Sequence, residues 1–531
     1  MADPAHDLRT HQEDADLLPE RVLHPQEELA RVLPMRLALH HAVCPIDLHD
    51  QTALIASSGP LHEDILDHLW QMGVFGTAVP AEQLDVKRFQ RQVYAHVATH
   101  AATRTPASQS GARRWHETPL VKRAIVPCVI IIGAALSLIY LTDIVLMIAA
   151  LWLAINAVFR AFLARTKLPN KDELGALAEH PTISIIIPLY NEASIVSELL
   201  ARLTAIDYPR SHLDVTLVLE REDVKTHAAL ARYTLPKWIR ILTLTGGLPR
   251  TKPRALNAAL PFAQGDIIGV YDAEDAPNHN QLRVIAGQFS RQPELSCVQA
   301  PLDIYNTQAG LLPTCFCIEY AMLFRRHNPG LGRSNLPIPL GGTSFFIRRS
   351  ALLSLGAWDA YNVTEDADLG FRLAAEGHQI SMITEATAEE APMRMTMWIK
   401  QRSRWLKGFM ITWLVSRPRE QGLSAFIILL GPIISAAITA LTAPLWLLTL
   451  LSGHVPNTLV LLTAAGLFAE AIQFTIGWLA LSEPHLRRHR WFLPLMPIYR
   501  LLLIPATIKA LVELIAAPVY WDKTLHGQLR L

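Results

Sequence analysis

The chain has 531 residues, of which 51% are hydrophobic and 18% are charged, and its formal net charge is +1. This composition is too apolar for a disordered chain or an ordinary soluble protein, and near-neutrality leaves no overall field that would recruit nucleic acid. No Cys-x-x-Cys pair occurs, which argues against a disulfide scaffold or a structural zinc site; the cysteines are Cys44, Cys128, Cys297, Cys315 and Cys317.

Residues 1–115 form the first predicted unit, a small cytosolic α+β domain with a linker. Short β-type runs alternate with helical spacing between residues 37 and 95, and residues 99–113 are rich in Thr, Ala, Ser and Arg. The acidic first residues lack the basic and apolar regions of a secretory signal. We therefore expect this end of the chain to begin in the cytosol.

A transmembrane helical hairpin is predicted for residues 120–165. Two apolar runs, 124–141 and 144–159, are separated by Thr142 and Asp143. At about 1.5 Å per residue, each run is long enough to cross a hydrocarbon core of roughly 30 Å as a helix. Basic residues flank both ends, which places both ends in the cytoplasm: Arg113, Arg114, Lys122 and Arg123 before, and Arg160, Arg165, Lys167 and Lys171 after.

Residues 175–415 have the alternating pattern of an α/β domain. The run TISIIIP at 182–188 is β-branched and ends at a proline, as expected of a buried strand, and helical spacing follows at 193–204. Further strands are predicted at 215–219, 239–244 and 267–271. This alternation indicates a largely parallel sheet, whose ligands collect at the carboxyl ends of the strands.

Three carboxylates follow the last of these strands: Asp272, Glu274 and Asp275. Crowded hard oxygen ligands suit Mg²⁺ or Mn²⁺ bridging a diphosphate, although such a loop by itself is more often a solvated turn. Upstream, Lys252 and Arg254 at a helix start are cations that could neutralise phosphate, or a plain basic patch.

Two later stretches carry similar alternatives. Glu365 and Asp366 precede a predicted helix, where carboxylates commonly act as caps, but a general base also needs such a group beside the substrate. The segment Gln401–Trp405, QRSRW, lies just ahead of the second membrane block. Its Arg and Trp residues suit either interfacial anchoring or phosphate pairing and sugar stacking.

Residues 420–531 form the second membrane block. Apolar runs at 423–451 and 458–481 are predicted spans, whereas 491–518 contains charges and prolines and is expected to be interfacial or re-entrant. Glu470 lies near the middle of the second span, where an ionisable group is costly and usually faces a cavity or a partner. It is a candidate channel-lining residue.

Four motifs in this order resemble the membrane-embedded family 2 glycosyltransferases, the group of the cellulose and hyaluronan synthases. They are Pro188–Glu192 (PLYNE), Asp272–Asp275 (DAED), Thr364–Asp366 (TED) and Gln401–Trp405 (QRSRW). The resemblance covers about residues 180–410 and implies a GT-A-like α/β domain inserted between transmembrane helices. It also implies a nucleotide-sugar donor, most often a UDP-sugar such as UDP-glucose.

The resemblance implies roles for individual residues. Donor-binding positions would be Tyr190, Glu192, Glu220, Lys252, Asp272, Arg402 and Arg404. The metal positions would be Asp272 with Glu274 or Asp275, and the metal Mg²⁺ or Mn²⁺. Asp366 would be the catalytic base, with Glu365 beside it. Trp405, Gly342 and Thr343 would contact the acceptor.

The order of elements in residues 37–95 resembles the N-terminal domain of type II secretion and type IV pilus assembly ATPases. That module senses cyclic di-GMP in some members, so cyclic di-GMP is a candidate partner, as is a periplasmic or outer-membrane export protein. The sequence has no GxxxxGK[ST] loop, so the chain is not itself such an ATPase.

The resulting hypothesis is an inverting, processive synthase in the bacterial inner membrane, with its N-terminal and catalytic domains in the cytosol. It would bind a nucleotide sugar, extend a polysaccharide and export it through its own helices, without nucleic acid. Two alternatives stay open: a transferase that adds one sugar to a lipid carrier, and a non-enzymatic membrane scaffold or phage-adsorption component.

Overall fold

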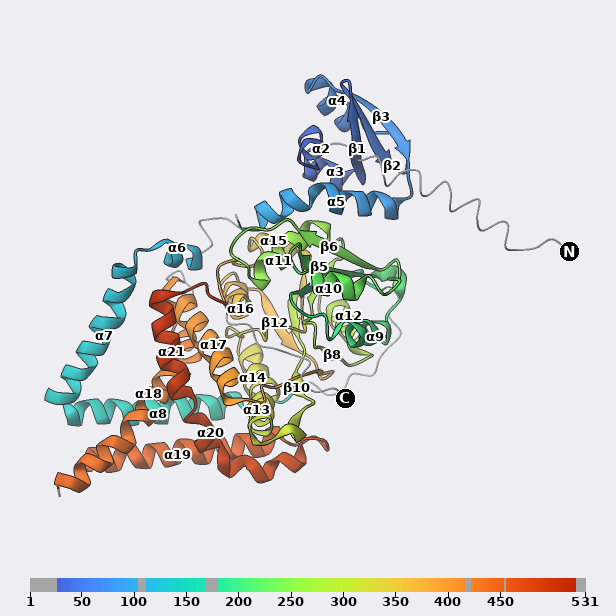
Figure 1. Ribbon diagram of the computed structural model, residues 1–531. Coiled ribbons are helices and arrows are strands. Elements are labelled where there is room, and N and C mark those ends of the chain that lie inside the picture. Colours follow the sequence, from blue (N-terminus) through green and yellow to red (C-terminus); the bar gives the residue numbers. More distant parts are fainter. Residues whose placement is uncertain (1–25, 104–110, 169–179, 416–421, 453–454, 522–531) are drawn as a thin grey trace.

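The computed structural model describes residues 26–103, 111–168, 180–415, 422–452 and 455–521. The acidic first residues and the middle of the expected linker lie outside this described part. Three bodies are visible in Figure 1: a small N-terminal domain, a central α/β domain, and a set of long helices on the side opposite the N-terminal domain.

The N-terminal domain is the expected α+β unit. Strands β1 (Val43–His49) and β2 (Thr52–Ser57) form an antiparallel hairpin, and β3 (Phe75–Pro80) pairs in parallel with β2. Helices pack against this sheet through an apolar core, and the long α5 faces the central domain (Figure 1). They are α2 (Gln26–Val32), α3 (Met35–His40), α4 (Glu63–Gln71) and α5 (Gln83–Ala102).

The central domain contains a seven-stranded sheet in the order β12-β9-β11-β7-β4-β5-β6. Four neighbouring strands, β7, β4, β5 and β6, are parallel, while β11 runs antiparallel to both of its neighbours. The bounds are β4 Ile183–Leu189, β5 Leu213–Glu220, β6 Ile239–Leu244, β7 Ile267–Val270, β9 Leu295–Gln299, β11 Phe345–Arg348 and β12 Gln379–Met382. The expected largely parallel α/β sheet is confirmed.

A second, three-stranded sheet and the helices complete this domain. The small sheet has the order β10-β13-β8, with β10 Leu302–Ile304, β13 Thr387–Glu389 and β8 Ala276–Pro277. The helices are α9 Val196–Thr204, α10 Val224–Leu230, α11 Lys252–Ala259, α12 Gln281–Arg291, α13 Leu311–Met322, α14 Asn328–Arg333, α15 Arg349–Ser354, α16 Glu365–Ala375 and α17 Met395–Val415.

Four helices in the described part of the chain are long and apolar enough to cross a membrane, as the sequence predicts. They are α7 Leu120–Tyr140, α8 Thr142–Leu163, α18 Leu423–Ser452 and α19 Asn457–Ala480. Thr458 at the start of α19 donates a hydrogen bond to Asp143 at the start of α8, at 2.5 Å. The turns of both helix pairs therefore lie at one end of the bundle, the end away from the α/β domain (Figure 1).

The pairing of these helices differs in part from the expected hairpin. The α7–α8 turn is tight, but α8 packs mainly along α19, and α7 diverges toward α21 (Figure 1). Sequence-adjacent apolar helices have no reason to prefer each other when a non-adjacent partner offers a better packed face.

The segment after α19 is broken into short pieces. A 3₁₀ stretch at Arg487–Leu495 leads into α20 (Met496–Arg500) and α21 (Leu503–Ala516), and α21 packs along α17. None of these pieces is among the candidate membrane spans of the described residues.

The end of α8 packs closely against the central domain at Gly330 of α14. A Cβ at Gly330 would lie 2.3 Å from the Leu163 carbonyl oxygen. Gly133 of α7, by contrast, has no atom within 4 Å of such a Cβ.

We expect Gly330→Ala to lower the melting temperature of the detergent-solubilised protein, because the added methyl group forces α8 away from α14 at a cost of about 1–3 kcal/mol. Gly133→Ala is the matched control and should leave the melting temperature unchanged or slightly higher. Equal melting temperatures for Gly330→Ala and the wild type would show that α8 and α14 can move apart without loss of stability.

Candidate active site

The polar residues that follow the parallel strands meet at one edge of the sheet. Tyr190 and Glu192 follow β4, Glu220 ends β5, and Asp272 and Glu274 follow β7. All five line one cavity of about 920 Å³. This meeting follows from the parallel topology, which puts the carboxyl ends of β4, β5 and β7 side by side.

The same cavity collects most of the other predicted site residues, although they come from distant parts of the chain. It is lined by residues of α11, the loop before β11, the start of α16, and α17. Those residues are Lys252, Gly342, Glu365, Asp366, Arg402, Arg404 and Trp405. Asp275 and Thr343 are not among the lining residues.

Asp275 is turned into the protein. It is 2% exposed, accepts a hydrogen bond from the Asp272 backbone N–H at 2.8 Å, and accepts another from the Thr343 hydroxyl. Asp275 and Thr343 thus hold the shape of the acidic loop, while Asp272 and Glu274 face the cavity. This geometry favours Glu274 over Asp275 as the second cavity-facing acid.

The acidic loop fits a divalent cation. Burial, followed by the charges of Asp272 and Glu192, raises the pKa of Glu274 to about 8. Burial also raises the pKa of Asp275, whose Oδ1 has no hydrogen-bond partner. Buried carboxylates whose pKa values rise through mutual repulsion are the groups that a bound cation would relieve.

Lys252 lies at the start of α11 among these acids. Its ammonium group pairs with Asp272 and donates to the Gly342 carbonyl at 2.8 Å. Burial opposes its charge, but Asp272, Glu365 and Asp366 together raise its pKa above the ordinary value. Lys252 is therefore charged and neutralises part of the acidic cluster.

Asp366 and Glu365 occupy the first turn of α16. Burial raises the pKa of Asp366, and burial with the charge of Asp366 raises that of Glu365 to about 8. A Cβ at Gly342, where φ is +72°, would lie 3.0 Å from Asp366 Oδ2. Glycine at this position therefore accommodates the backbone and leaves space beside the carboxylate.

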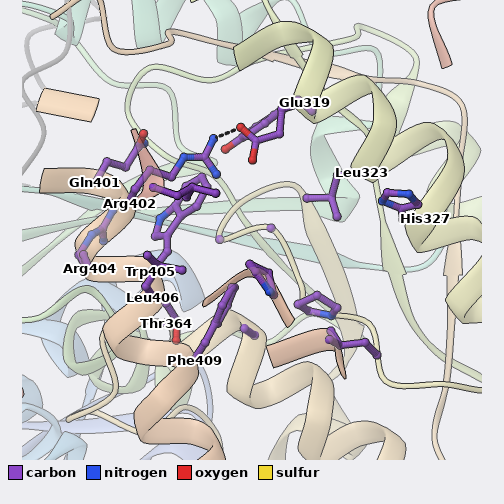
Figure 2. Close-up of a pocket in the computed structure, with 18 of the residues that line it drawn as sticks. Glu319, Leu323, His327, Thr364, Gln401, Arg402, Arg404, Trp405, Leu406 and Phe409 are labelled. Atoms are coloured by element: carbon purple, nitrogen blue, oxygen red, sulfur yellow. Dashed lines mark hydrogen bonds and ion pairs between the residues drawn. The ribbon is translucent and has the colours of Figure 1, made fainter. Parts of the chain in front are cut away.

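The two arginines of QRSRW point in different directions from α17 (Figure 2). Arg402 pairs with Glu319 of α13 at 2.5 Å, and its guanidinium lies 4.3 Å from the centre of the Trp405 ring. Arg404 lies 4.3 Å from the Trp521 ring and interacts electrostatically with Glu365, Asp366 and Asp272. Arg404 thus faces the acidic cluster, whereas Arg402 is engaged in an internal ion pair.

Sequence reasoning missed several residues that line the cavity. Glu319 is one, and Glu389 and Glu390 at the end of β13 are others. Burial, followed by Asp275, Glu274 and Asp272, raises the pKa of Glu389. In the sequence, the only sign of Glu389 and Glu390 was that two acids stand side by side before Pro392. That pattern does not indicate which cavity these side chains line.

The cavity continues from the α/β domain into the membrane helices. Its lining there includes Asn156 and Arg160 of α8, Thr439 of α18, Glu470 of α19 and Arg500 of α20. Glu470 forms an ion pair with Arg500. The predicted channel-lining position of Glu470 therefore lies on the same cavity as Asp366.

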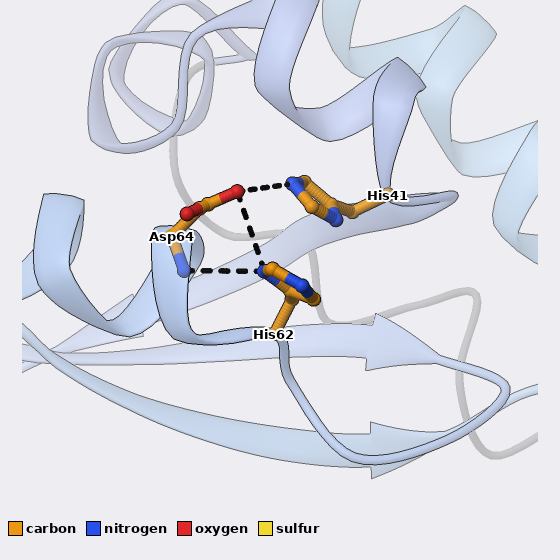
Figure 3. Close-up of side chains that lie close together, drawn as sticks. All are labelled: His41, His62 and Asp64. Atoms are coloured by element: carbon orange, nitrogen blue, oxygen red, sulfur yellow. Dashed lines mark hydrogen bonds and ion pairs between the residues drawn. The ribbon is translucent and has the colours of Figure 1, made fainter.

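A second polar cluster lies in the N-terminal domain (Figure 3). Asp64 Oδ2 is 3.3 Å from both His41 Nε2 and His62 Nδ1. The two imidazoles stack 4.4 Å apart with 27° between their planes, so their in-plane lone pairs do not converge on one ion. His62 Nδ1 also accepts the Asp64 backbone N–H, which makes the cluster a cap for α4.

Comparison with known families agrees with this geometry. Residues 180–408 match the model for "Glycosyltransferase like family 2", and residues 14–100 match the model for the MshEN domain. Both expected resemblances, that of the central domain and that of the N-terminal domain, are confirmed. Residues 180–408 are thus a family 2 glycosyltransferase domain with a GT-A-like fold.

Curated relatives carry the same domain. Probable glycosyltransferase YdaM of Bacillus subtilis is 26% identical over 44% of this chain and 56% of its own length. Beta-monoglucosyldiacylglycerol synthase of Trichormus variabilis is 29% identical over 46% of this chain and 52% of its own. The catalytic subunit of cellulose synthase from Pseudomonas fluorescens is 28% identical over 43% and 31%. The chain spans about half the length of the first two relatives.

Among solved structures, a mannosyltransferase from Pyrobaculum calidifontis, in complex with GDP-Man and Mn²⁺, is similar to 70% of this chain and 97% of its own. Its sequence identity is 19% and the TM-score is 0.48.

We expect Asp272→Asn to weaken Mn²⁺ binding in the presence of UDP by at least about tenfold, because it removes a charged oxygen ligand that faces the cavity. Titration calorimetry on the full-length protein in detergent measures this. Asp207→Asn, an exposed aspartate paired with Arg283, is the control. Equal Mn²⁺ affinity for Asp272→Asn and the wild type would exclude Asp272 as a ligand.

Proposed function

We propose that this chain, which carries a family 2 glycosyltransferase domain, is an inverting and processive polysaccharide synthase embedded in the bacterial inner membrane. The donor is a nucleotide sugar, a UDP-sugar such as UDP-glucose. The observation that carries the proposal is one continuous cavity that joins Asp272 and Asp366 to Glu470 between the membrane helices. A growing polymer has a path along that cavity.

The reaction transfers a sugar from the nucleotide diphosphate to an acceptor hydroxyl. Asp366 takes the proton of the hydroxyl as its oxygen attacks the anomeric carbon, and the bond from that carbon to the diphosphate oxygen breaks. The raised pKa of Asp366 suits a group that must accept a proton. Lys252 and Arg404 stabilise the charge on the departing diphosphate.

Asp272 and Glu274 would hold Mg²⁺ or Mn²⁺, which supplies further positive charge at the diphosphate. Lys252, beside Asp272, would contact the phosphate of a bound donor. Tyr190, Glu192 and Glu220 border the nucleotide at the ends of β4 and β5.

We assign the acceptor to the part of the cavity lined by Gly342 and by Trp405 of α17. Thr343, next to Gly342, bonds Asp275 and does not line the cavity. Arg402 supports Trp405 from behind through its contact with the ring and its ion pair with Glu319. We assign Arg402 to this support instead of donor binding.

The N-terminal and catalytic domains face the cytosol in this proposal. Basic residues flank the apolar helices on the domain side, and both helix turns lie at the opposite end of the bundle. The MshEN match supports cyclic di-GMP as a ligand of the N-terminal domain, and an export protein is the expected partner on the far side of the membrane.

A second candidate function is the addition of one sugar to a lipid. Arg160 in the last turn of α8 lines the cavity, and its Nε donates to the neutral Asn156 side chain at 2.8 Å. A cavity-facing arginine at the domain end of a membrane helix suits a lipid phosphate. The similarity to a glucosyldiacylglycerol synthase points the same way. A non-enzymatic scaffold is disfavoured, because it would need none of the cavity-facing acids.

We expect Asp366→Asn to reduce sugar transfer by about 10²–10⁴-fold, the usual contribution of a general base, while UDP binding stays within threefold of the wild type. Glu376→Gln, an exposed change at the end of the same helix, is the control. In the wild type, burial raises the pKa of Asp366, so the rate should rise with pH over a range above that of an ordinary aspartate, because the base acts deprotonated. Loss of UDP binding together with transfer would make Asp366 a structural residue.

The length of the product separates the two candidate functions. The purified protein, reconstituted with Mg²⁺ or Mn²⁺ and offered a panel of UDP- and GDP-sugars, should release nucleotide and form a product of many sugar units. Size-exclusion chromatography and mass spectrometry of the product measure this. A product of one sugar on an extractable lipid would favour the second candidate, and absence of nucleotide release would support a scaffold.

A further inference from the structure

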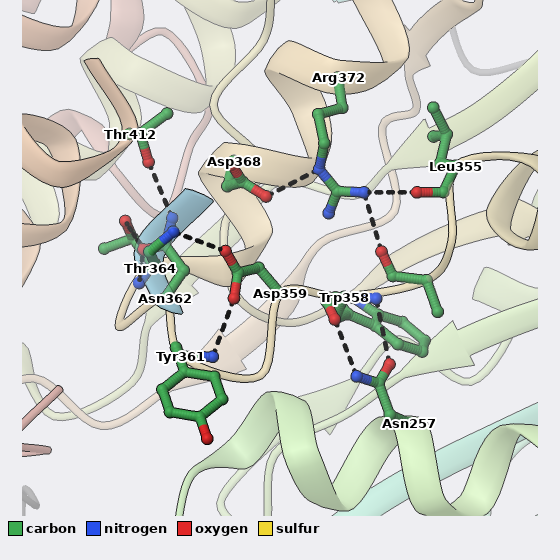
Figure 4. A network of polar contacts seen from close by, with 12 residues as sticks. Asn257, Leu355, Trp358, Asp359, Tyr361, Asn362, Thr364, Asp368, Arg372 and Thr412 are labelled. Carbon is green, nitrogen blue, oxygen red and sulfur yellow. Dashed lines mark hydrogen bonds and ion pairs between the residues drawn. The ribbon is translucent and has the colours of Figure 1, made fainter. Parts of the chain in front are cut away.

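The loop that precedes Asp366 is bonded to the N-terminal part of the chain. This loop, residues 355–364 between α15 and α16, is here called the Asp366 loop. Figure 4 shows part of its polar contacts. They reach α11, α17 and the start of α6 (Gly111–Glu117), and through α11 they reach the end of α5.

Asn257 of α11 makes the first of these links. Its Nδ2 donates to the Trp358 carbonyl at 2.8 Å and to the Ala102 carbonyl at 3.2 Å, and its Oδ1 accepts the Trp358 N–H at 3.1 Å. Ala102 is the last residue of α5. One buried amide therefore joins the N-terminal domain to the Asp366 loop.

Asp359 makes the second link. Its Oδ2 accepts the backbone N–H of Ala112 at 3.1 Å, and its Oδ1 accepts the N–H of Tyr361 at 2.9 Å. Ala112 lies at the start of α6 (Gly111–Glu117), just before the first membrane helix. The carboxylate thus bonds the Asp366 loop to the other end of the joining segment.

Further bonds hold the part of the loop nearest to Asp366. Asn362 Oδ1 accepts the N–H of Thr364 at 3.0 Å, and Asn362 Nδ2 donates to Thr412 of α17 at 3.0 Å. Thr251, which precedes Lys252, donates to the Ala360 carbonyl at 2.7 Å. The Asp366 loop is therefore held at several points. Ala112 of the N-terminal part is bonded to it directly, and Ala102 is linked to it through Asn257.

An apolar contact supports these bonds. α5 packs against α11, the helix whose first residue is Lys252, and the core of the N-terminal domain is continuous with residues of α11 and with Trp358. A shift of α5 along α11 would thus displace the Ala102 carbonyl from Asn257.

We propose that Asn257 and Asp359 are positioning residues that couple the docking of the N-terminal domain to the placement of Asp366. The predicted effect of this coupling on catalysis rests on the proposed function. The structural part of the proposal, that these two residues hold the Asp366 loop in place, does not depend on that function.

Asn257→Asp and Asp359→Asn are the test variants, because each keeps the size of the side chain. Asn257→Asp replaces the amide donor by a carboxylate oxygen that faces the carbonyl oxygens of Ala102 and Trp358. Asp359→Asn replaces one carboxylate oxygen by an NH₂ group, so one of the two backbone N–H groups bonded to Asp359 loses its acceptor. We expect kcat to fall by about 10- to 100-fold in each, as for a misplaced catalytic group, with KM for the UDP-sugar within threefold of the wild type.

His96→Ala is the matched control. His96 is a residue of α5 that contacts Thr245 at 3.3 Å and Glu27 at 3.4 Å, neither of which belongs to the Asp366 loop. It should leave kcat within threefold of the wild type. An unchanged kcat in both test variants would overturn the proposal, as would an equal fall in His96→Ala.

Hydrogen–deuterium exchange keeps the test independent of turnover. Asn257→Asp and Asp359→Asn should raise exchange in peptides covering residues 357–368, while the central strands keep wild-type protection. Unchanged exchange in 357–368 would overturn the coupling even if the enzyme is active. Raised exchange in a protein that transfers no sugar would support the coupling and count against the proposed function alone.

Discussion

The structure depends on the placement of one ammonium group among several buried carboxylates. Lys252 is the cation that pairs with Asp272 and lowers the cost of keeping Glu365 and Asp366 near it. Burial raises the pKa of Glu365 and of Asp366, and the charge of Lys252 partly offsets that rise. The position of Lys252 follows from α11, whose first turn carries it and whose far side packs against the N-terminal domain.

The same cleft opens toward the membrane helices, and this opening determines which functions are reasonable. A soluble transferase needs no cavity that runs from Asp366 to Glu470. Polar groups line it within the helices, where Glu470 pairs with Arg500 and the Thr439 hydroxyl donates to the Ser435 carbonyl at 2.9 Å. The nature of the acceptor therefore depends on the membrane helices as well as on the α/β domain.

The N-terminal domain shares a core with the central domain, and the start of α6 is bonded to the loop that precedes Asp366. In the proposed coupling, a small change in docking would move Asp366 without any ligand entering the cavity. This arrangement also gives α11 two roles, since one end holds Lys252 and the middle holds Asn257.

Much of this protein follows from local sequence signals. Long uncharged runs predict the four membrane-type helices because each helix must satisfy its own backbone in lipid, and β-branched runs predict β4, β5, β6 and β7 because such strands are buried on both faces. The order of PLYNE, DAED, TED and QRSRW indicates the family domain. Strands β9, β11 and β12 each include polar residues, such as Gln299, Arg348 and Gln379, so they lack the uninterrupted apolar run that β7 has.

Tertiary structure decided the rest, because side-chain direction and long-range packing leave little trace in local sequence. Only the fold shows that Asp275 turns inward while Glu274 faces the cavity, and that Arg402 and Arg404, two residues apart on a helix, point to different partners. The pairing of α8 with α19, the bond between Asn257 and Ala102, and the bond between Asp359 and Ala112 join residues more than a hundred positions apart. Such contacts depend on the shape of the packed faces, which the order of the residues does not reveal.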